Sequence, residues 1–272
     1  MSNRIDKKLK AIKDAGQRAL VPFITVGFPD IDTSQELAKA VLESGADMLE
    51  LGVPFSDPVA EGPTIQMTSF RAIEKGANLN AALNVVRNLR ADGVTAPLIF
   101  MGYLNPYLHH GMEKFSQDAS DAGLDGMIIP DLPPEEAAPY AEVLEKHGMY
   151  LIPLLAPTST AERIAQACKQ ARGFIYCVSV TGVTGARQTP SERVADLVKA
   201  IRKQTELPIL VGFGVSTREH VDIIGEFADG AIVGSALLNA IDASPPGNEV
   251  EAARAFVRNL KGTDQQGITA AI

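Results

Sequence analysis

Eight short apolar runs recur along almost the whole chain, and amphipathic segments with helical spacing separate them. Most of the runs are continuously apolar rather than alternating, which is typical of strands covered on both faces of a parallel sheet. The predicted strands are Leu20–Val26, Met48–Leu51, Leu98–Met101, Gly126–Ile129, Tyr150–Leu155, Phe174–Val178, Ile209–Val211 and Ala231–Val233. Strands that alternate with helices in this way predict an α/β protein built from repeated βα units.

The number of strands and the chain length favour a closed barrel over an open sheet. An open sheet of eight strands would usually bring a dinucleotide-binding glycine fingerprint or a break halfway along the chain, and neither is visible. A length of 272 residues is usual for a (β/α)8 TIM barrel. We therefore predict a single (β/α)8 barrel domain over residues 1–272, with an additional N-terminal helix and a polar, frayed tail over about 262–272.

Three of the intervening helices carry a start signal, a serine or threonine followed three residues later by glutamate. In this capping box the hydroxyl accepts a backbone N–H and the carboxylate reaches back to the first residue. The pairs are Thr33 and Glu36, Ser159 and Glu162, and Ser216 and Glu219. The first residue of each pair is the expected N-cap.

Charge and hydropathy limit the possible partners. The formal net charge of -8 leaves no basic surface excess for a nucleic acid. The N-terminus lacks the apolar core of a signal peptide, and no apolar run approaches membrane-spanning length. We therefore expect a cytoplasmic protein that binds neither nucleic acid nor a membrane.

Two kinds of catalysis are disfavoured by the positions of lysine and histidine. No lysine stands at the carboxyl end of a predicted strand, so an imine-forming aldolase would lack its nucleophile. The four histidines, His109, His110, His147 and His220, have no metal-ligand spacing, and no metal site is predicted. Acid–base catalysis by carboxylates remains.

Glu50, Glu61 and Asp131 lie at or after the ends of predicted strands, where barrel enzymes carry their catalytic groups. Glu50 stands inside an apolar run, where a buried carboxylate is costly unless function requires it. The alternative for Glu50 is a hydrogen-bonded core carboxylate. Glu61 lies in a long loop stiffened by prolines, and its alternative is a solvated loop charge. Asp131 fits a structural role better, as a loop anchor or helix cap.

Three glycine-rich segments follow the last three predicted strands, and each would let backbone N–H groups approach an anion. They contain Gly185, Gly214 and the pair Gly234 and Ser235, where a helix would begin and direct its positive end toward the site. Each segment alone fits a turn that closes a strand for steric reasons. Together they predict a phosphate site, because barrel enzymes often bind phosphate at this position.

Several motifs of the chain resemble those of the tryptophan synthase alpha subunit family. The most specific is ELGVPFSDP at 50–58, which continues as GPTIQ at 62–66. Further similarities are VPFIT at 21–25, MGYLNP at 101–106, PDLP at 130–133 and the late glycine segments. The resemblance covers most of the chain.

This resemblance implies retro-aldol cleavage of indole-3-glycerol phosphate to indole and glyceraldehyde 3-phosphate, a step of tryptophan biosynthesis that needs no cofactor. Glu50 would act as general acid and base, and Glu61 would handle the ring N–H of the indole. The implied partner is the tryptophan synthase beta subunit, in an alpha-beta-beta-alpha complex.

The resemblance also assigns binding residues. The indole pocket would be lined by Phe23, Tyr103, Tyr176 and Phe213. The phosphate would be held by Gly185, Gly214, Gly234 and Ser235.

One position departs from the family pattern, because Glu61 stands where the family usually has aspartate. The extra methylene would carry the carboxylate about an ångström too far, a displacement that costs on the order of 100-fold in rate. A catalytically weakened subunit that mainly activates its beta partner is therefore one alternative. A stand-alone indole-releasing lyase, with the same chemistry and no obligate beta partner, is another. An unrelated phosphosugar isomerase on the same fold is the third alternative, and the motif at 50–66 disfavours it.

Overall fold

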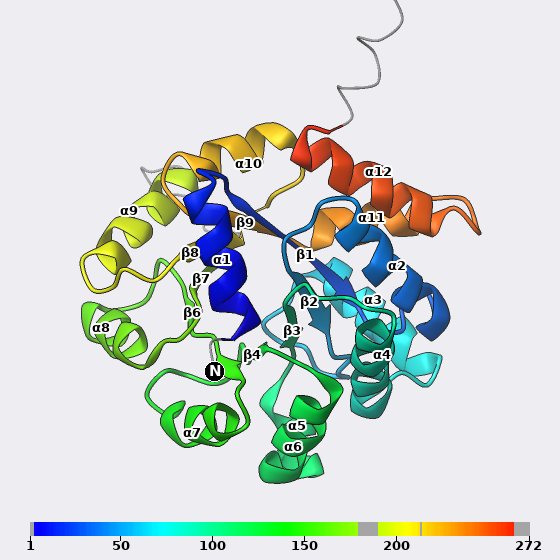
Figure 1. The fold of residues 1–272 in the computed structure, drawn as a ribbon, viewed down its shortest axis with the longest axis horizontal. Helices are drawn as coiled ribbons and strands as arrows, with labels where there is room; N and C mark the ends of the chain where they lie inside the picture. The colour runs from blue at the N-terminus through cyan, green and yellow to red at the C-terminus, as the bar shows by residue number, and fades with distance from the viewer. Residues whose placement is uncertain (1–2, 179–189, 213, 264–272) are drawn as a thin grey trace, which may run out of the picture.

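The strands form one parallel sheet that curls into a barrel (Figure 1). A computed structural model describes residues 3–178, 190–212 and 214–263. The strands in this part of the chain are β1 Ala19–Thr25, β2 Leu49–Gly52, β3 Leu98–Met101, β4 Gly126–Ile128, β5 Tyr150–Leu151, β6 Leu154–Leu155, β7 Ile175–Val178, β8 Ile209–Gly212 and β9 Gly230–Val233. Their order in the sheet is β5-β4-β3-β2-β1-β9-β8-β7-β6. The predicted (β/α)8 barrel is confirmed, with most strand ends within a residue of the prediction.

One predicted strand is wrong as a continuous element. The run Tyr150–Leu155 forms two short strands, β5 and β6, because Pro153 between them has no N–H to donate to a ladder. Backbone pairing nevertheless passes through the break: Ile152 N–H donates to Met127 C=O at 2.8 Å, and Pro153 C=O accepts from Tyr176 N–H at 3.1 Å. Residues 152 and 153 therefore link β4 on one side to β7 on the other and close the barrel.

Helices surround the strands, as Figure 1 shows. Their apolar faces cover the outside of the sheet, as in the helix α4, where Leu83, Val86 and Leu89 are buried. In the described residues the helices are α1 Arg4–Asp14, α2 Ile31–Glu43, α3 Pro63–Glu74, α4 Leu79–Ala91, α5 Leu104–His110, α6 Met112–Ala122, α7 Ala138–Lys146, α8 Ala161–Gln170, α9 Pro190–Arg202, α10 Arg218–Gly225, α11 Ser235–Asp242 and α12 Glu249–Lys261.

The additional N-terminal helix is confirmed as α1, which lies across one end of the barrel (Figure 1). Its buried residues Ile5, Leu9 and Ile12 join the cluster formed by the inward-facing side chains of the strands. The hydroxyl of Tyr150 donates to the Asp6 carboxylate at 2.7 Å and ties the helix to the start of β5. Helix α1 therefore covers the amino ends of the strands and leaves their carboxyl ends open.

The three capping-box predictions misplace the helix starts by one to three residues. Helix α2 begins earlier than expected, under Asp30, whose carboxylate accepts from Thr33 N–H at 2.8 Å. Helices α8 and α10 begin under Thr160 and Thr217, one residue after the expected caps. In each case another hydroxyl or carboxylate stood close to the predicted N-cap. That group could accept the free backbone N–H three residues later.

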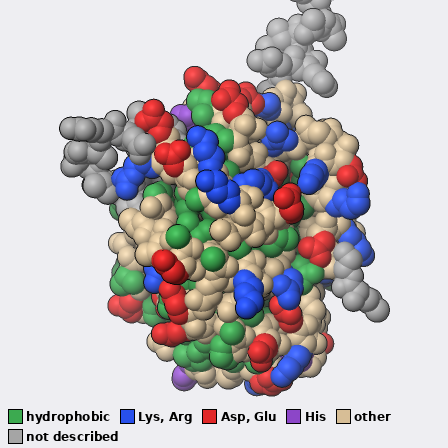
Figure 2. Space-filling view, turned by 90° about the vertical axis from the view of Figure 1, so that its left-hand side faces the viewer, with side chains coloured by type: hydrophobic (Ala, Val, Ile, Leu, Met, Phe, Trp, Pro, Cys, Tyr) green, Lys and Arg blue, Asp and Glu red, His purple; other side chains and the backbone are tan. Residues whose placement is uncertain are grey.

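The surface mixes charges of both signs. Figure 2 shows acidic and basic side chains interspersed on one face, with hydrophobic side chains between them.

Helix α12 ends at Gly262, which takes the left-handed conformation with φ 72°. The predicted tail from about 262 lies outside the described residues from 264 onward.

Candidate active site

A cavity of about 480 Å³ opens at the carboxyl ends of the strands. Side chains from β1, β2, β3, β6, β7 and β9 reach it, together with the loops that follow β2, β4, β8 and β9. Its lining residues are Phe23, Glu50, Ala60, Glu61, Ile65, Met101, Pro130, Leu154, Tyr176, Val178, Gly212, Gly214, Val215, Ile232, Gly234, Ser235, Ala236 and Asn239. This is the end of the barrel at which enzymes of this fold carry their catalytic groups.

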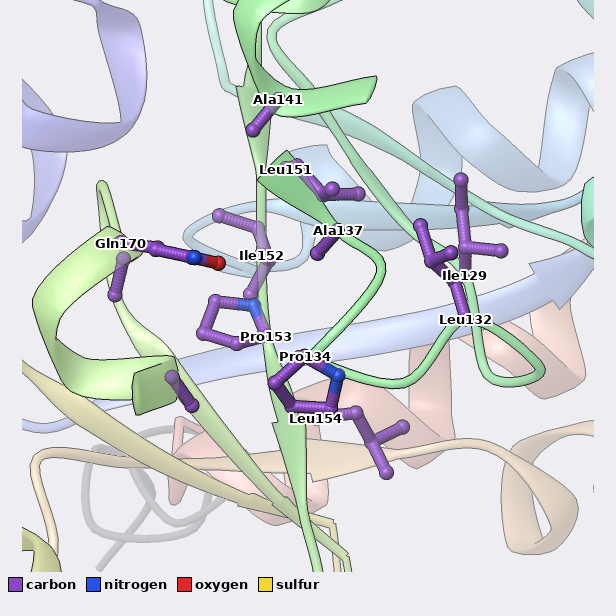
Figure 3. A pocket seen from close by; sticks show the side chains of 12 residues that line it. Ile129, Leu132, Pro134, Ala137, Ala141, Leu151, Ile152, Pro153, Leu154 and Gln170 are labelled. Atoms are coloured by element: carbon purple, nitrogen blue, oxygen red, sulfur yellow. The ribbon is translucent and has the colours of Figure 1, made fainter. Parts of the chain in front are cut away.

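A second cavity, beside the break between β5 and β6, contrasts with the first (Figure 3). Leucine, isoleucine, alanine and proline side chains surround it, and Gln170 is the polar side chain among its lining residues. Among the described residues, no titratable side chain lines this cavity, so it has no group for acid–base chemistry. The barrel cavity, which lies at the carboxyl ends of the strands, is the candidate active site.

Glu50 lies in the middle of β2 and lines the barrel cavity. Its neighbours in the sheet are Phe23 on β1 and Ile99 on β3, and its exposed fraction is 0%. Neither carboxyl oxygen has a hydrogen-bond partner among the described residues. Burial, reinforced by the charge of Glu61, raises the pKa of Glu50 well above its usual value. A satisfied core carboxylate, the alternative interpretation of this residue, would have partners.

Glu61 lies in the loop between β2 and α3, residues 53–62, which we term the Glu61 loop. The backbone of Glu61 is bonded on both sides: its N–H donates to Pro58 C=O within the loop at 3.0 Å, and the Gln66 amide donates to its C=O at 2.8 Å. The side chain lines the cavity, and burial raises its pKa from 4.5 to about 7. Glu61 is therefore not a freely solvated loop charge.

Burial raises the pKa of both carboxyl groups, and the charge of Glu61 raises the pKa of Glu50 further. Both shifts favour the protonated form, while Glu61, with a pKa of about 7, is partly ionised at neutral pH. Two titratable groups in one cavity whose environments separate their pKa values can serve as acid and base in the same reaction. The site is equipped for proton transfer in both directions.

Two of the four predicted indole-pocket residues, Phe23 and Tyr176, line the cavity. Their rings lie over glycines of neighbouring strands. A Cβ on Gly52 would stand 2.4 Å from Cζ of Phe23, and one on Gly212 would stand 2.5 Å from the hydroxyl of Tyr176. A side chain at either glycine would displace the ring that lies over it. A glycine at the end of a predicted strand is therefore a signal in the sequence that a ring can pack there.

The other two predicted pocket residues are not among the described lining of the cavity. Tyr103 is buried behind the Glu61 loop, where its hydroxyl oxygen accepts from Ala60 N–H at 2.8 Å. Phe213 lies outside the described residues.

Gly214, Gly234 and Ser235, three of the four predicted phosphate residues, line one part of the cavity. Gly214 takes a positive φ of 46° in open space. Helix α11 begins at Ser235 under Gly234, with no side-chain cap, so the N–H groups of its first turn face the cavity end without a side-chain acceptor. Gly185 lies outside the described residues. The start of α11 is suited to an anion.

Asn239 also lines the cavity, although it was not predicted from the sequence. It lies one turn after Ser235 on α11, so helical spacing from the predicted phosphate site was the signal that could have found it. Its amide oxygen accepts from the Thr64 hydroxyl at 3.1 Å, which joins α11 to the helix that follows the Glu61 loop.

Within the described residues no group of three or more His, Cys, Asp or Glu side chains could hold a metal ion. No helix in that part of the chain is long and apolar enough to cross a membrane.

The fold and the cavity define an enzyme of the (β/α)8-barrel class. A family model described as "Tryptophan synthase alpha chain" matches residues 9–266. The chain is 47% identical over 260 residues to the tryptophan synthase alpha chain of Roseiflexus sp. (strain RS-1), covering 96% of this chain and 100% of the relative. The chain belongs to the tryptophan synthase alpha chain family.

Solved structures agree with this assignment. The crystal structure of tryptophan synthase subunit alpha from Legionella pneumophila str. Paris superposes with a TM-score of 0.90 at 39% identity, covering 98% of this chain and 100% of the other. A chain of tryptophan synthase from M. tuberculosis, in a ligand-free form, superposes with a TM-score of 0.86 at 33% identity, covering 95% and 98%.

Proposed function

We propose that this chain cleaves indole-3-glycerol phosphate to indole and glyceraldehyde 3-phosphate, with Glu50 and Glu61 as its catalytic residues. Membership of the tryptophan synthase alpha chain family makes the chain a carbon–carbon lyase of tryptophan biosynthesis. The observation that carries the residue assignment is the Glu50 carboxyl group, which is fully buried, lines the cavity and has no hydrogen-bond partner among the described residues. Such a group is costly to fold around unless the reaction uses it.

In the proposed reaction Glu50 begins as the acid. It donates its proton to the ring carbon that bears the glycerol phosphate chain, while Glu61 accepts the ring N–H proton, and an indolenine tautomer results. Glu50, now a carboxylate, then removes the proton of the hydroxyl next to that carbon. The carbon–carbon bond breaks and its electron pair returns to the ring, while Glu61 gives its proton back to the ring nitrogen, so that indole forms. The oxygen becomes the aldehyde of the second product. Water enters neither product.

The binding assignments follow the cavity. The rings of Phe23 and Tyr176 would pack against the indole ring, with Phe213 as a third wall predicted from the resemblance. Gly234 and Ser235 at the start of α11, with Gly214 and Gly185, would hold the phosphate through backbone N–H groups. No cofactor takes part in these steps.

Glu61 would perform the role that aspartate has in the family. The longer side chain fits if the backbone of the Glu61 loop stands about an ångström further back, and a misplaced carboxylate would cost about 100-fold in rate. The proposal therefore includes an active Glu61, and a comparison with Glu61→Asp measures how well it serves.

The partner would be a tryptophan synthase beta subunit that receives the indole, in an alpha-beta-beta-alpha complex. Tryptophan synthase from M. tuberculosis contains a chain that superposes on this one. We propose that residues 1–272 act as one barrel domain in that complex, in the cytoplasm, without nucleic acid or membrane as partners.

The test is indole release from indole-3-glycerol phosphate by the purified chain, alone and with a tryptophan synthase beta subunit, beside Glu61→Asp. Slow release that the beta subunit accelerates is the expected result. Fast release without the partner would favour a stand-alone lyase. If the chain stimulates the beta subunit but releases no indole until Glu61 is changed to aspartate, it is a weakened activating subunit. No release by either protein would overturn the proposed function.

A further inference from the structure

The hydroxyl of Tyr103 bridges two loops at the top of the barrel. Tyr103 follows β3, and its oxygen accepts from the backbone N–H of Ala60 at 2.8 Å. Ala60 is the residue before Glu61 in the Glu61 loop. The bond therefore joins the end of one strand to the backbone that carries the second carboxylate of the cavity.

Tyr103 is itself held firmly, which a positioning contact requires. Its ring stacks on Phe55 with 5.3 Å between the centroids, and Phe55 is fixed in turn by the Ser69 hydroxyl, which bonds both its N–H and its C=O. The next residue, Leu104, donates its N–H to the Asp131 carboxylate at 3.0 Å. The loops after β2, β3 and β4 are thus linked through Tyr103 and its neighbour.

We propose that Tyr103 is a positioning residue for the cleavage reaction: its hydroxyl oxygen holds the Ala60 amide and so fixes where the Glu61 carboxylate stands in the cavity. This inference rests on the proposed function. It differs from the role of indole-pocket wall that the resemblance gives to Tyr103, which is not among the described residues that line the cavity.

The state of the hydroxyl agrees with this role. Burial raises the pKa of Tyr103 to about 12, so the group is a neutral phenol at the pH of catalysis. A neutral phenol accepts the Ala60 N–H through a lone pair. Without the oxygen, the amide of Ala60 loses its partner. The start of the Glu61 loop stays joined to β3 by the bond from Val53 N–H to Met101 C=O at 2.9 Å, but the bond next to Glu61 is lost.

The variant that tests this assignment is Tyr103→Phe, which removes the oxygen and leaves the ring on Phe55. Tyr107→Phe is a matched control, because the Tyr107 hydroxyl is buried without a hydrogen-bond partner among the described residues. Indole release is measured for both variants, and for Tyr103→Phe combined with Glu61→Gln. Hydrogen exchange of the Ala60 amide, followed by NMR, reports the bridge independently of activity.

We expect Tyr103→Phe to lower kcat about 10- to 100-fold with KM changed less than about twofold, since the carboxylate is misplaced rather than the substrate. In the Glu61→Gln background the same change should lower kcat no further. The Ala60 amide should exchange faster in Tyr103→Phe, and Tyr107→Phe should match the wild type in all measurements.

Each other outcome overturns the inference in a distinguishable way. Wild-type kcat in Tyr103→Phe, or an equal loss in the Glu61→Gln background, would show that Tyr103 does not act through Glu61. A rise in KM alone would return Tyr103 to the pocket wall. If the wild type releases no indole, the proposed function fails and takes this role with it, whatever the exchange of Ala60 shows.

Discussion

The guanidinium of Arg90 donates to the carboxylate of Asp125 at 2.6 Å, at the end of the barrel opposite the cavity. The same carboxylate oxygen accepts the N–H of Leu98, the first residue of β3, at 2.9 Å. Asp125 stands just before β4, so it ties the entry of one strand to the start of its neighbour. Both side chains are largely buried, with 13% of Arg90 and 3% of Asp125 exposed.

This arrangement occurs at two other strand entries. Asp47, before β2, accepts from Leu20 N–H of β1 at 3.0 Å and from Lys261 at 2.5 Å. The third aspartate, Asp229, stands before β9. Its carboxylate accepts from Ile209 N–H at the start of β8 and from Arg202 at the end of α9. A carboxylate paired with a cation thus fixes adjacent strands at three places around the barrel.

We predict that Asp125→Asn lowers the free energy of unfolding by about 3 kcal/mol, because it leaves the buried guanidinium of Arg90 without its counter-charge. Urea denaturation monitored by circular dichroism measures the loss. The control is Asp14→Asn, which breaks the exposed pair with Lys10 and should leave the midpoint unchanged. Equal midpoints for both variants would contradict the structural role of the buried pair.

Glu50 should cost the protein stability at high pH. Its folded pKa is raised, so above about pH 4.5 the unfolded chain loses a proton that the folded chain keeps. Stability from this group therefore falls as pH rises, until the folded pKa is passed. Glu50→Gln, which cannot ionise, should gain stability over the wild type by about 1.4 kcal/mol for each pH unit above 4.5, up to the folded pKa of Glu50.

The advantage of Glu50→Gln should shrink as pH is lowered toward 4.5. Thermal or urea unfolding across this range measures it, and Glu74→Gln, at an exposed position on α3, is the control. A gain independent of pH would mean that Glu50 is not buried with its proton.

The rate of indole release should depend on pH through both carboxyl groups. The value of kcat/KM should rise through about pH 7 as Glu61 ionises, and fall at higher pH as Glu50 loses its proton. In Glu61→Gln the rise near pH 7 should disappear from the residual activity. The fall should move to lower pH, because the charge of Glu61 no longer raises the pKa of Glu50. An unchanged profile would show that Glu61 does not titrate in the reaction.

Ser235→Asp separates binding from stability at the start of α11. A carboxylate at a helix N-terminus stabilises the fold by about 0.3–1 kcal/mol, but it would repel a substrate phosphate from the same N–H groups. We expect KM to rise about 10-fold or more with no loss of thermal stability. Ser235→Asn, of similar size and without the charge, is the control. If both variants keep the wild-type KM, the phosphate lies elsewhere.

Local sequence patterns predicted the strands and helices whose structure depends mainly on neighbouring residues in the chain. The run Leu98–Met101 is a strand with those same ends, because a short apolar run bounded by turns has no competing helix. The run Tyr150–Leu155 failed at Pro153, a residue whose missing N–H is visible in the sequence. Asp30 caps α2, whereas the capping-box pattern at Thr33 predicts a later start, because both residues can accept a backbone N–H three residues on.

The site could be predicted only where a motif carried it. Glu50 and Glu61 came from an unusual carboxylate in an apolar run and from a family signature. The bridge from Tyr103 to Ala60 and the pair of Lys261 with Asp47 join residues 43 and 214 positions apart. No local pattern encodes such pairs, since they depend on how the closed barrel brings its loops and ends together.

The most direct test of the central claim compares indole release from indole-3-glycerol phosphate by the wild type and by Glu50→Gln under single-turnover conditions. Glutamine keeps the shape and neutral charge of the resting acid but cannot give up a proton. Loss of acid–base catalysis should lower the rate about 100- to 10,000-fold, while the variant stays folded at pH 8. A Glu50→Gln protein that releases indole at the wild-type rate would contradict the account.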